Sequence, residues 1–323
     1  MVSRADTTAL EIERRRREEA EAESEEIDRT PVRSYWQLVR RRFIQHRLAV
    51  FGAIALIVLA LYGLVIPIVT GEGWRTTHLF LPDAPPQLFD KDGKLTFAIL
   101  GYNEIGQDLF ARLAKATQTS LEIGLAAVLI IVTIGIFIGS IAGYVGGWLD
   151  NVMMRFVDVM LSLPALFVIL MITAFFGGGN IWVVILAIGI TGWTTAARLV
   201  RAEFLSLREV DYVQAARALG ASPRRIIIRH MLPPALAPIV VAATLGIADS
   251  VVVESALSFL GFGLGNQEAS LGTMLENAQN YFFSGPLKVV YPGVVLILIV
   301  LSASFLGDGL RDALDPRQRV ETK

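Results

Sequence analysis

The sequence predicts an all-α integral membrane protein with six transmembrane helices. Of its 323 residues, 54% are hydrophobic, and the mean hydropathy of +0.55 exceeds what a soluble domain needs to fill its core. Uncharged stretches of about 20 residues, the length that crosses a ~30 Å hydrocarbon layer, recur along the chain. The net charge of −1 sums opposite local charges and therefore identifies no partner, and the absence of cysteine excludes disulfides and thiolate metal sites.

Six apolar segments are long enough to span a membrane. The stretch 159–197 is interrupted by "FFGGGN" (175–180), whose glycines and asparagine favour a turn, so it is expected to form two spans joined by a hairpin. The expected spans cover residues 48–70, 123–143, two segments within 159–197, 231–253 and 289–307.

The distribution of basic residues predicts the orientation. With the N-terminus inside, 23 of the 29 Lys and Arg residues lie in the two terminal segments and the inner loops. Cytoplasmic loops collect basic residues, so both termini and the loop between spans four and five are expected in the cytoplasm. No cleavable signal is expected, because the first apolar run starts near residue 48 and is too long for one.

The expected domain organisation follows from these spans. The first segment, with "EIERRRREEAEAESEE", is dense in both charges and cannot bury a core, so it is expected to be disordered or loosely helical. The expected parts are a cytosolic tail (1–33), an N-terminal lead with the first span (34–70), an extracytoplasmic loop (71–118), a transmembrane core (119–311) containing a cytoplasmic loop (203–234), and a cytosolic tail (312–323).

The cytoplasmic loop 203–234 is expected to form a helical hairpin. Residues 204–219 have helix-forming composition, and Gly220 stands where a helix end favours a left-handed residue. Ser222 as N-cap with Pro223 at the first helical position predicts a second helix, which leads to span five at the prolines Pro233 and Pro234. This hairpin could dock on a partner protein through its small residues and through arginine guanidinium groups, which pair with carboxylates. Alternatively, it could be a basic hairpin that lies on anionic lipid.

The hairpin resembles a known motif. The stretch "QAARALGASPRRIIIRHMLPP" is similar to the EAA loop of permease subunits of ATP-binding-cassette importers, whose pattern is EAA, three residues, Gly, nine residues, Ile, one residue, Leu-Pro. Two positions depart from this pattern. Gln214 replaces the Glu, which removes a charge before the glycine, and His230 replaces the Ile. The positions in register are Gln214, Ala215, Ala216, Gly220, Leu232 and Pro233.

Further segments resemble the C-type permeases of dipeptide and oligopeptide importers. They are "WQLVRRRFIQHRLAVFGAIAL", "GYNEIGQDLFARLAKATQTSLEIG", "DNVMMRFVDVMLSLPALF" and "ESALSFLGFG", in the family's order, and the resemblance covers residues 36–316. In the second, Asn103 and Gln107 are among the departures that lose charge. The resemblance implies a fold like that of type I importers, in a bacterial or archaeal inner membrane.

The resemblance also implies partners. A permease of this kind has no energy source of its own, and the sequence contains no GxxxxGK[ST] P-loop, so ATP and Mg²⁺ are expected in partner subunits and no cofactor in this chain. The implied partners are a second, B-type permease, two ABC ATPase subunits, an external substrate-binding protein and the lipid bilayer, without nucleic acid. The outer segment 71–118 contains a turn-rich loop and, over residues 105–115, a pattern that favours an amphipathic helix; it would receive the binding protein or cover the translocation mouth. The residues expected to couple to the ATPase are Gln214, Ala215, Ala216, Gly220, Ser222, Pro223, Arg224, Arg225 and Pro233.

Polar residues within the spans are the other candidates. Asp249 and Glu254 interrupt span five, and either could line the route of a peptide's ammonium group or be paired structurally. Arg155 and Asp158, three apart, are expected to pair on one helix face. Gly135, Gly139, Gly143 and Gly147 form a smooth ridge, for packing within the chain or against the second permease.

Other function classes were weighed against this interpretation. His46, His78 and His230 lack metal-ligand spacing, so no metal is expected, and no nucleophile arrangement suggests an enzyme. A secondary transporter or channel without an ATPase would more typically show inverted halves and broken helices. Importers of nickel, glutathione or sugars within the same family remain open.

Overall fold

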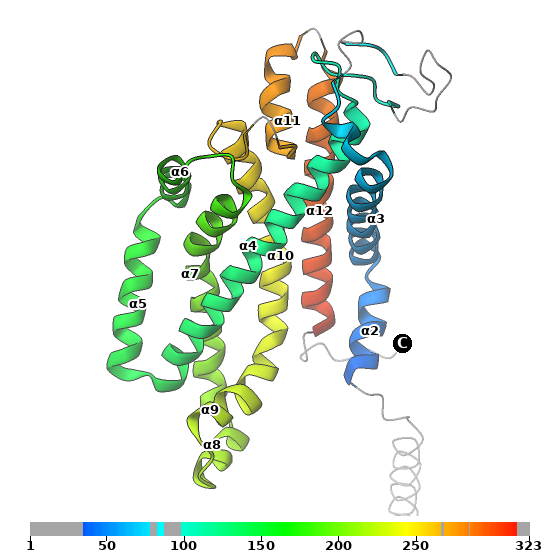
Figure 1. Ribbon diagram of the computed structural model, residues 1–323. Coiled ribbons are helices and arrows are strands. Elements are labelled where there is room, and N and C mark those ends of the chain that lie inside the picture. Colours follow the sequence, from blue (N-terminus) through cyan, green and yellow to red (C-terminus); the bar gives the residue numbers. More distant parts are fainter. Residues whose placement is uncertain (1–34, 78–82, 87–97, 266–267, 284, 315–323) are drawn as a thin grey trace, which may run out of the picture. The chain divides into compact units, whose positions relative to one another are not determined.

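The computed structural model describes residues 35–77, 83–86, 98–265, 268–283 and 285–314 (Figure 1). The chain divides into two units, Met1–Arg42 and Phe43–Lys323. The expected charged tail 1–33, part of the tail 312–323 and most of the turn-rich part of the outer loop lie outside the described residues. The described residues of the first unit, 35–42, belong to helix α2 (Tyr35–Gln45).

Helices dominate the described part of the second unit, which confirms the predicted all-α membrane fold. Five helical segments are long and apolar enough to cross a membrane, and they overlap five of the expected spans. They are α3 (Arg47–Thr70), α4 (Leu109–Val145), α7 (Ile181–Arg208), α10 (Leu232–Phe259) with the short helices before it, and α12 (Leu287–Leu314).

The expected third span is bent. Helices α5 (Gly147–Ser162) and α6 (Ala165–Phe176) meet at 80°, and only if this pair counts as one span does the total reach six. The break lies at Leu163, whose backbone is extended (φ −90°, ψ 132°) because Pro164 disfavours a helical residue before it. This bend within the third span was not predicted from the sequence. The expected turn at 175–180 is present, and the Asn180 side chain caps α7 by accepting from the Trp182 amide at 2.9 Å.

Helix α4 begins well before the expected start at residue 123. The Asp108 carboxylate caps it by accepting from the amides of Phe110 (2.8 Å) and Ala111 (3.2 Å). The first turns carry Arg112 and Lys115, which hydropathy alone excludes from a span. Arg112 is nevertheless buried, because its guanidinium donates to the Gln107 side chain at 2.6 Å. The amphipathic helix expected over 105–115 is thus present from Leu109 onward, and it is continuous with the span that was expected to start at residue 123.

The glycine ridge of α4 packs against α7. A Cβ atom at Gly139 would lie 2.5 Å from the Ala197 carbonyl oxygen and 2.7 Å from the Val200 Cβ. Equivalent atoms at Gly135 and Gly143 would also lie 2.6 Å from side chains of α7. The ridge therefore serves packing within this chain, and the alternative of a contact with a second permease is wrong for these three glycines. Gly147 has φ +61° and a Cβ there would meet nothing within 4 Å, so it is not part of the ridge.

The remaining long helices complete the bundle around α4. Helix α12 lies beside α3 and α10, and α4 also contacts α3 and α10 (Figure 1). Close approach again uses small residues, since a Cβ at Gly52 of α3 would lie 2.5 Å from the Ser302 carbonyl oxygen of α12. The shorter elements are η1 (Gly71–Trp74), α8 (Asp211–Ala218), α9 (Pro223–Arg225), the π-helical η2 (Ile226–Met231), α11 (Leu271–Ala278) and η3 (Gln279–Tyr281).

We expect Gly139→Leu to lower the thermal midpoint of the purified protein by about 5 °C or more, because a side chain there forces α4 and α7 apart. Gly293→Ala is the matched control, since a Cβ at Gly293 of α12 meets nothing within 4 Å. Thermal unfolding in detergent, followed by size-exclusion chromatography, measures both. Equal midpoints for the two variants would contradict the packing account.

Candidate functional site

Helix α7 ends at Arg208, and α8 starts after a turn at Glu209 and Val210. One continuous helix over 204–219 was expected, and this is wrong. The Val210 backbone is extended (φ −78°, ψ 140°) and redirects the chain. Asp211 then begins α8, where its negative charge is favourable at the helix N-terminus.

Gly220 terminates helix α8. Its φ of +80° lies in the left-handed region, the Gly220 amide donates to the Arg217 carbonyl (3.0 Å), and the Ala221 amide donates to the Ala216 carbonyl (3.1 Å). These two bonds are the Schellman pattern that satisfies the last carbonyls of a helix. Ser222 and Pro223 follow at the N-cap and first position of α9, although the Ser222 side chain makes no capping bond.

The two prolines do not separate α9 from the next helix. The chain runs from α9 through η2 directly into α10, with Pro233 in the first turn of α10, where its missing N–H is tolerated. Pro234 likewise offers no amide to the His230 carbonyl four residues earlier. The Tyr212 hydroxyl donates to that carbonyl at 3.1 Å and thereby ties α8 to η2.

The α8–α9 hairpin (residues 211–231) has a buried face and an exposed face. Val213, Ile226 and Met231 are buried in one cluster with Val200 and Phe204 of α7. Of the residues expected to couple to an ATPase, Ala216 is buried and the others are exposed: Gln214, Ala215, Gly220, Ser222, Pro223, Arg224, Arg225 and Pro233.

One exposed residue of the hairpin was missed from the sequence. Leu219, next to Gly220, is 88% exposed and continues the exposed small residues of α8. A leucine at helical spacing is normally assigned to a core, so no pattern in the sequence distinguishes it.

Ion pairs join the bent helix α5 to α7. The buried Asp150 carboxylate accepts from Nε and Nη2 of Arg201, with an Nη2–Oδ2 distance of 2.7 Å. Asp158 pairs with Arg198 at 2.6 Å, whereas the expected partner Arg155 is 3.9 Å away. The main partner of Asp158 therefore comes from the neighbouring helix, and the expected pair on one helix face is the weaker contact.

Glu254 lies in a buried hydrogen-bond network that joins three segments. Its side chain is fully buried and accepts from Ser120 of α4 and Ser258 of α10, both at 2.8 Å. The Ser120 hydroxyl oxygen in turn accepts from the Leu271 amide of α11 at 3.2 Å, and that of Ser258 accepts from the Leu264 amide at 3.2 Å. Glu254 is thus a connector of α4, α10 and α11, and it faces no cavity.

Asp249 has a different environment, although it is only five residues earlier on α10. Its side chain is exposed, and it lines a cavity of about 270 Å³ between α4, α6, α7 and α10. Of the two carboxylates expected to flank a translocation route, the structure brings only Asp249 to a cavity wall.

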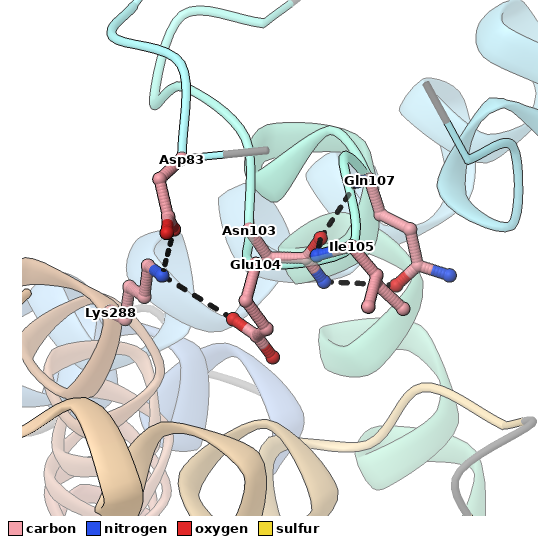
Figure 2. A network of polar contacts seen from close by, with 6 residues as sticks. All are labelled: Asp83, Asn103, Glu104, Ile105, Gln107 and Lys288. Carbon is pink, nitrogen blue, oxygen red and sulfur yellow. Dashed lines mark hydrogen bonds and ion pairs between the residues drawn. The ribbon is translucent and has the colours of Figure 1, made fainter. Parts of the chain in front are cut away.

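A polar cluster lies at the end of the bundle that carries α11 (Figure 2). Lys288, at the start of α12, pairs with Asp83 and, at 3.3 Å, with Glu104. The Asn103 and Gln107 side-chain amides hydrogen bond to each other at 3.0 Å. These two residues depart from the related pattern by losing charge, and the structure shows that the two neutral side chains are partners. The cluster fastens the outer loop to α12.

In the described part of the chain, no group of three or more His, Asp or Glu side chains is placed to hold a metal ion.

Comparison with known proteins defines the class of the protein as a membrane permease. The family model described as "Binding-protein-dependent transport system inner membrane component" matches residues 135–320, and the model "N-terminal TM domain of oligopeptide transport permease C" matches residues 34–86. The chain belongs to this family of binding-protein-dependent transport permeases.

Individual relatives match over nearly the whole chain. An oligopeptide transport system permease protein of Haemophilus influenzae is 37% identical over 288 residues, which cover 89% of this chain and 90% of the relative. The oligopeptide permease protein of Escherichia coli K12 is 35% identical, covering 89% and 93%. A dipeptide transport system permease protein of Alkalihalophilus pseudofirmus is 34% identical, covering 88% and 91%. These matches confirm the resemblance to C-type permeases.

A solved structure shares the fold. A chain of the MetNI methionine ABC transporter, in an inward-facing conformation, superimposes with a TM-score of 0.52 at 20% identity, covering 63% of this chain and 96% of that one. The two chains therefore share the core arrangement of helices.

We expect Glu254→Ala to lower the thermal midpoint by about 5 °C or more, because the hydroxyls of Ser120 and Ser258 lose their buried acceptor. Asp249→Ala removes the same charge from an exposed position on the same helix, so its midpoint should stay within about 2 °C of the wild type. Thermal unfolding in detergent compares the pair. Similar losses in both variants would show that the Glu254 network does not hold α4, α10 and α11 together.

Proposed function

We propose that this chain is the permease subunit of an ATP-driven importer of oligopeptides or dipeptides in a bacterial or archaeal inner membrane. The relatives that cover most of its length carry oligopeptide and dipeptide permease names. The excess of Lys and Arg in the terminal segments and in the 203–234 loop supports an orientation with both termini and the α8–α9 hairpin in the cytoplasm.

The observation that carries this proposal is the α8–α9 hairpin. Its exposed face presents small residues and the guanidinium groups of Arg224 and Arg225, which suit a partner's backbone and carboxylates. Its buried face shares a core with α7 and continues into α10, so a displacement of the hairpin is transmitted to both helices. The exposed residues from Gln214 to Pro233, with Leu219, are the proposed contact with a nucleotide-hydrolysing subunit.

The proposed assembly contains a second permease, two ABC ATPase subunits that hold ATP and Mg²⁺, and an external substrate-binding protein. ATP-driven closure of the ATPase subunits would move the two hairpins and bias inward-facing against outward-facing states. ATP acts only through its different affinity for those states. The Lys288 cluster would fix the outer loop where the binding protein delivers its cargo.

The assembly can be tested directly. We expect affinity purification of this chain from its native membrane to recover an ATP-hydrolysing subunit in stoichiometric amount. In reconstituted vesicles with the binding protein, uptake of labelled peptides should require ATP and exceed uptake of nickel or glutathione. Uptake by this chain alone, driven by an ion gradient, would instead establish a secondary transporter.

We expect Gly220→Val to reduce ATP-driven uptake at least about tenfold while the chain still inserts and binds its partners. A Cβ at Gly220 would meet nothing within 4 Å, so the defect comes from the backbone: φ is +80°, and a β-branched residue is disfavoured there. Gly220→Asn is the matched control, because asparagine adopts the left-handed region readily, and we expect it to retain most uptake. Wild-type uptake by the valine variant would rule out the hairpin as the coupling element.

A further inference from the structure

The cavity beside Asp249 has an apolar wall with a few polar groups. Residues of α4, α6, α7 and α10 line its volume of about 270 Å³. The wall is formed by aliphatic side chains and glycines, apart from Thr191, Thr195, Asp249 and Ser250. Asp249 is the only charged residue among the described residues that line it. The cavity therefore combines a single negative charge with a non-specific apolar surface.

Asp249 has no cationic partner in the described part of the chain. The other carboxylates of the long helices considered above are paired or hydrogen bonded: Asp150 with Arg201, Asp158 with Arg198, and Glu254 with serine hydroxyls. No Lys, Arg or His among the described residues lies within ion-pairing distance of Asp249. Its charge is therefore available to a group from outside this chain.

The exposed side of Asp249 is unlike a lipid-facing surface. Helix α3 shows what such a surface looks like here, with apolar side chains exposed along its length, including Phe51, Ile54, Ile57 and Leu61. An unpaired carboxylate is costly to place within the hydrocarbon. The two acidic residues of α10 (232–259) are Asp249 and Glu254, and of these only Glu254 is buried. The face that carries Asp249 must therefore meet water or a polar group.

We infer that Asp249 is a cation-binding residue in the translocation route and receives the primary ammonium group of a transported peptide. This inference rests on the proposed function. An ammonium group has three donors. The carboxylate of Asp249 can accept from it. The Thr191 hydroxyl oxygen is a further acceptor in the cavity wall, because its own proton is donated to the Ala187 carbonyl at 2.8 Å.

The rest of the cavity fits a carrier of varied peptides. Aliphatic side chains such as Val128, Ile131 and Val253 offer apolar contact without selecting one hydrogen-bonding pattern. The amino terminus, which peptides have in common, binds the Asp249 carboxylate, and the variable side chains contact the apolar wall. Glu254 takes no part, because its oxygens already accept from serine hydroxyls and it is fully buried.

The charge of the cavity can be measured with thiol reagents. The chain has no cysteine, so Thr195→Cys places a single reporter in the wall without further changes to this chain. The assembled transporter in membranes is treated with methanethiosulfonate reagents of similar size that carry an ammonium or a sulfonate group. We expect Asp249→Asn to lower the ratio of cationic to anionic modification rates at least about fivefold.

The matched control is Asp308→Asn, which removes an exposed carboxylate of α12 that does not line the cavity, and it should leave that ratio unchanged. An unchanged ratio in Asp249→Asn would overturn the inference. So would a loss of the second permease on purification of that variant, since Asp249 would then pair with the partner subunit and not with cargo.

Measurements of peptide uptake test whether the group that Asp249 binds belongs to the transported peptide. With saturating peptide-loaded binding protein, we expect Asp249→Asn to reduce the maximal rate of ATP-driven uptake about tenfold and Asp249→Glu to restore at least half of it. Wild-type uptake by Asp249→Asn would overturn the inference and leave the proposed function intact. A wild-type complex without ATP-driven peptide uptake would refute the proposed function, whereas the reagent ratio would still report the charge of the cavity.

Discussion

The close approach of α4 and α7 is the contact on which the rest of the second unit depends. Three glycines spaced by four residues bring the backbone of α4 against Ala196, Ala197 and Val200 of α7. In a membrane such contacts replace the hydrophobic effect as the source of helix association, because lipid tails are as apolar as the side chains. One face of α7 is thereby held on α4, and other α7 residues line the Asp249 cavity and pack under the α8–α9 hairpin. The cavity and the hairpin thus both contact the closely packed helices α4 and α7.

Buried polar groups hold the bundle at both ends. Near the hairpin, Asp150 and Arg201 join α5 to α7, and near α11, Glu254 gathers Ser120 and Ser258. A polar group without a partner is costly in hydrocarbon, so each network specifies which segments must lie together. Asp249 stands apart from these networks, because its side chain is exposed and lines the cavity.

The hairpin is rigid for reasons that lie in the backbone. A Schellman end at Gly220, a proline at the start of α9 and the bond from Tyr212 to the His230 carbonyl hold α8 against the helix that becomes α10. The π-helical turn η2 runs directly into α10, whose first turn contains the two prolines. The hairpin is therefore continuous with α10 and packed on α7.

Local sequence predicted several parts of this structure correctly. Apolar length identified the long helices, because crossing hydrocarbon requires a minimum number of uncharged residues. Gly220 and the glycines before Asn180 marked turns, because positive φ is accessible to glycine at little cost. The spaced motifs also identified the family, and they did so before any packing was known.

Tertiary structure decided the remaining features, which depend on contacts between distant segments. Helix α4 includes the charged Arg112 ahead of the predicted span, because the Gln107 side-chain oxygen accepts a hydrogen bond from its guanidinium, and hydropathy does not register such a partner. Asp158 prefers Arg198, forty residues away, over its neighbour Arg155. Asp249 and Glu254 are the same kind of residue on one helix, and only the packing of α4, α7 and α11 around them makes one a free charge and the other a buried connector. The sequence by itself determined which segments are helical and apolar, since that is a local balance of backbone and solvent; which polar groups meet was decided by the fold, since their partners lie far apart along the chain.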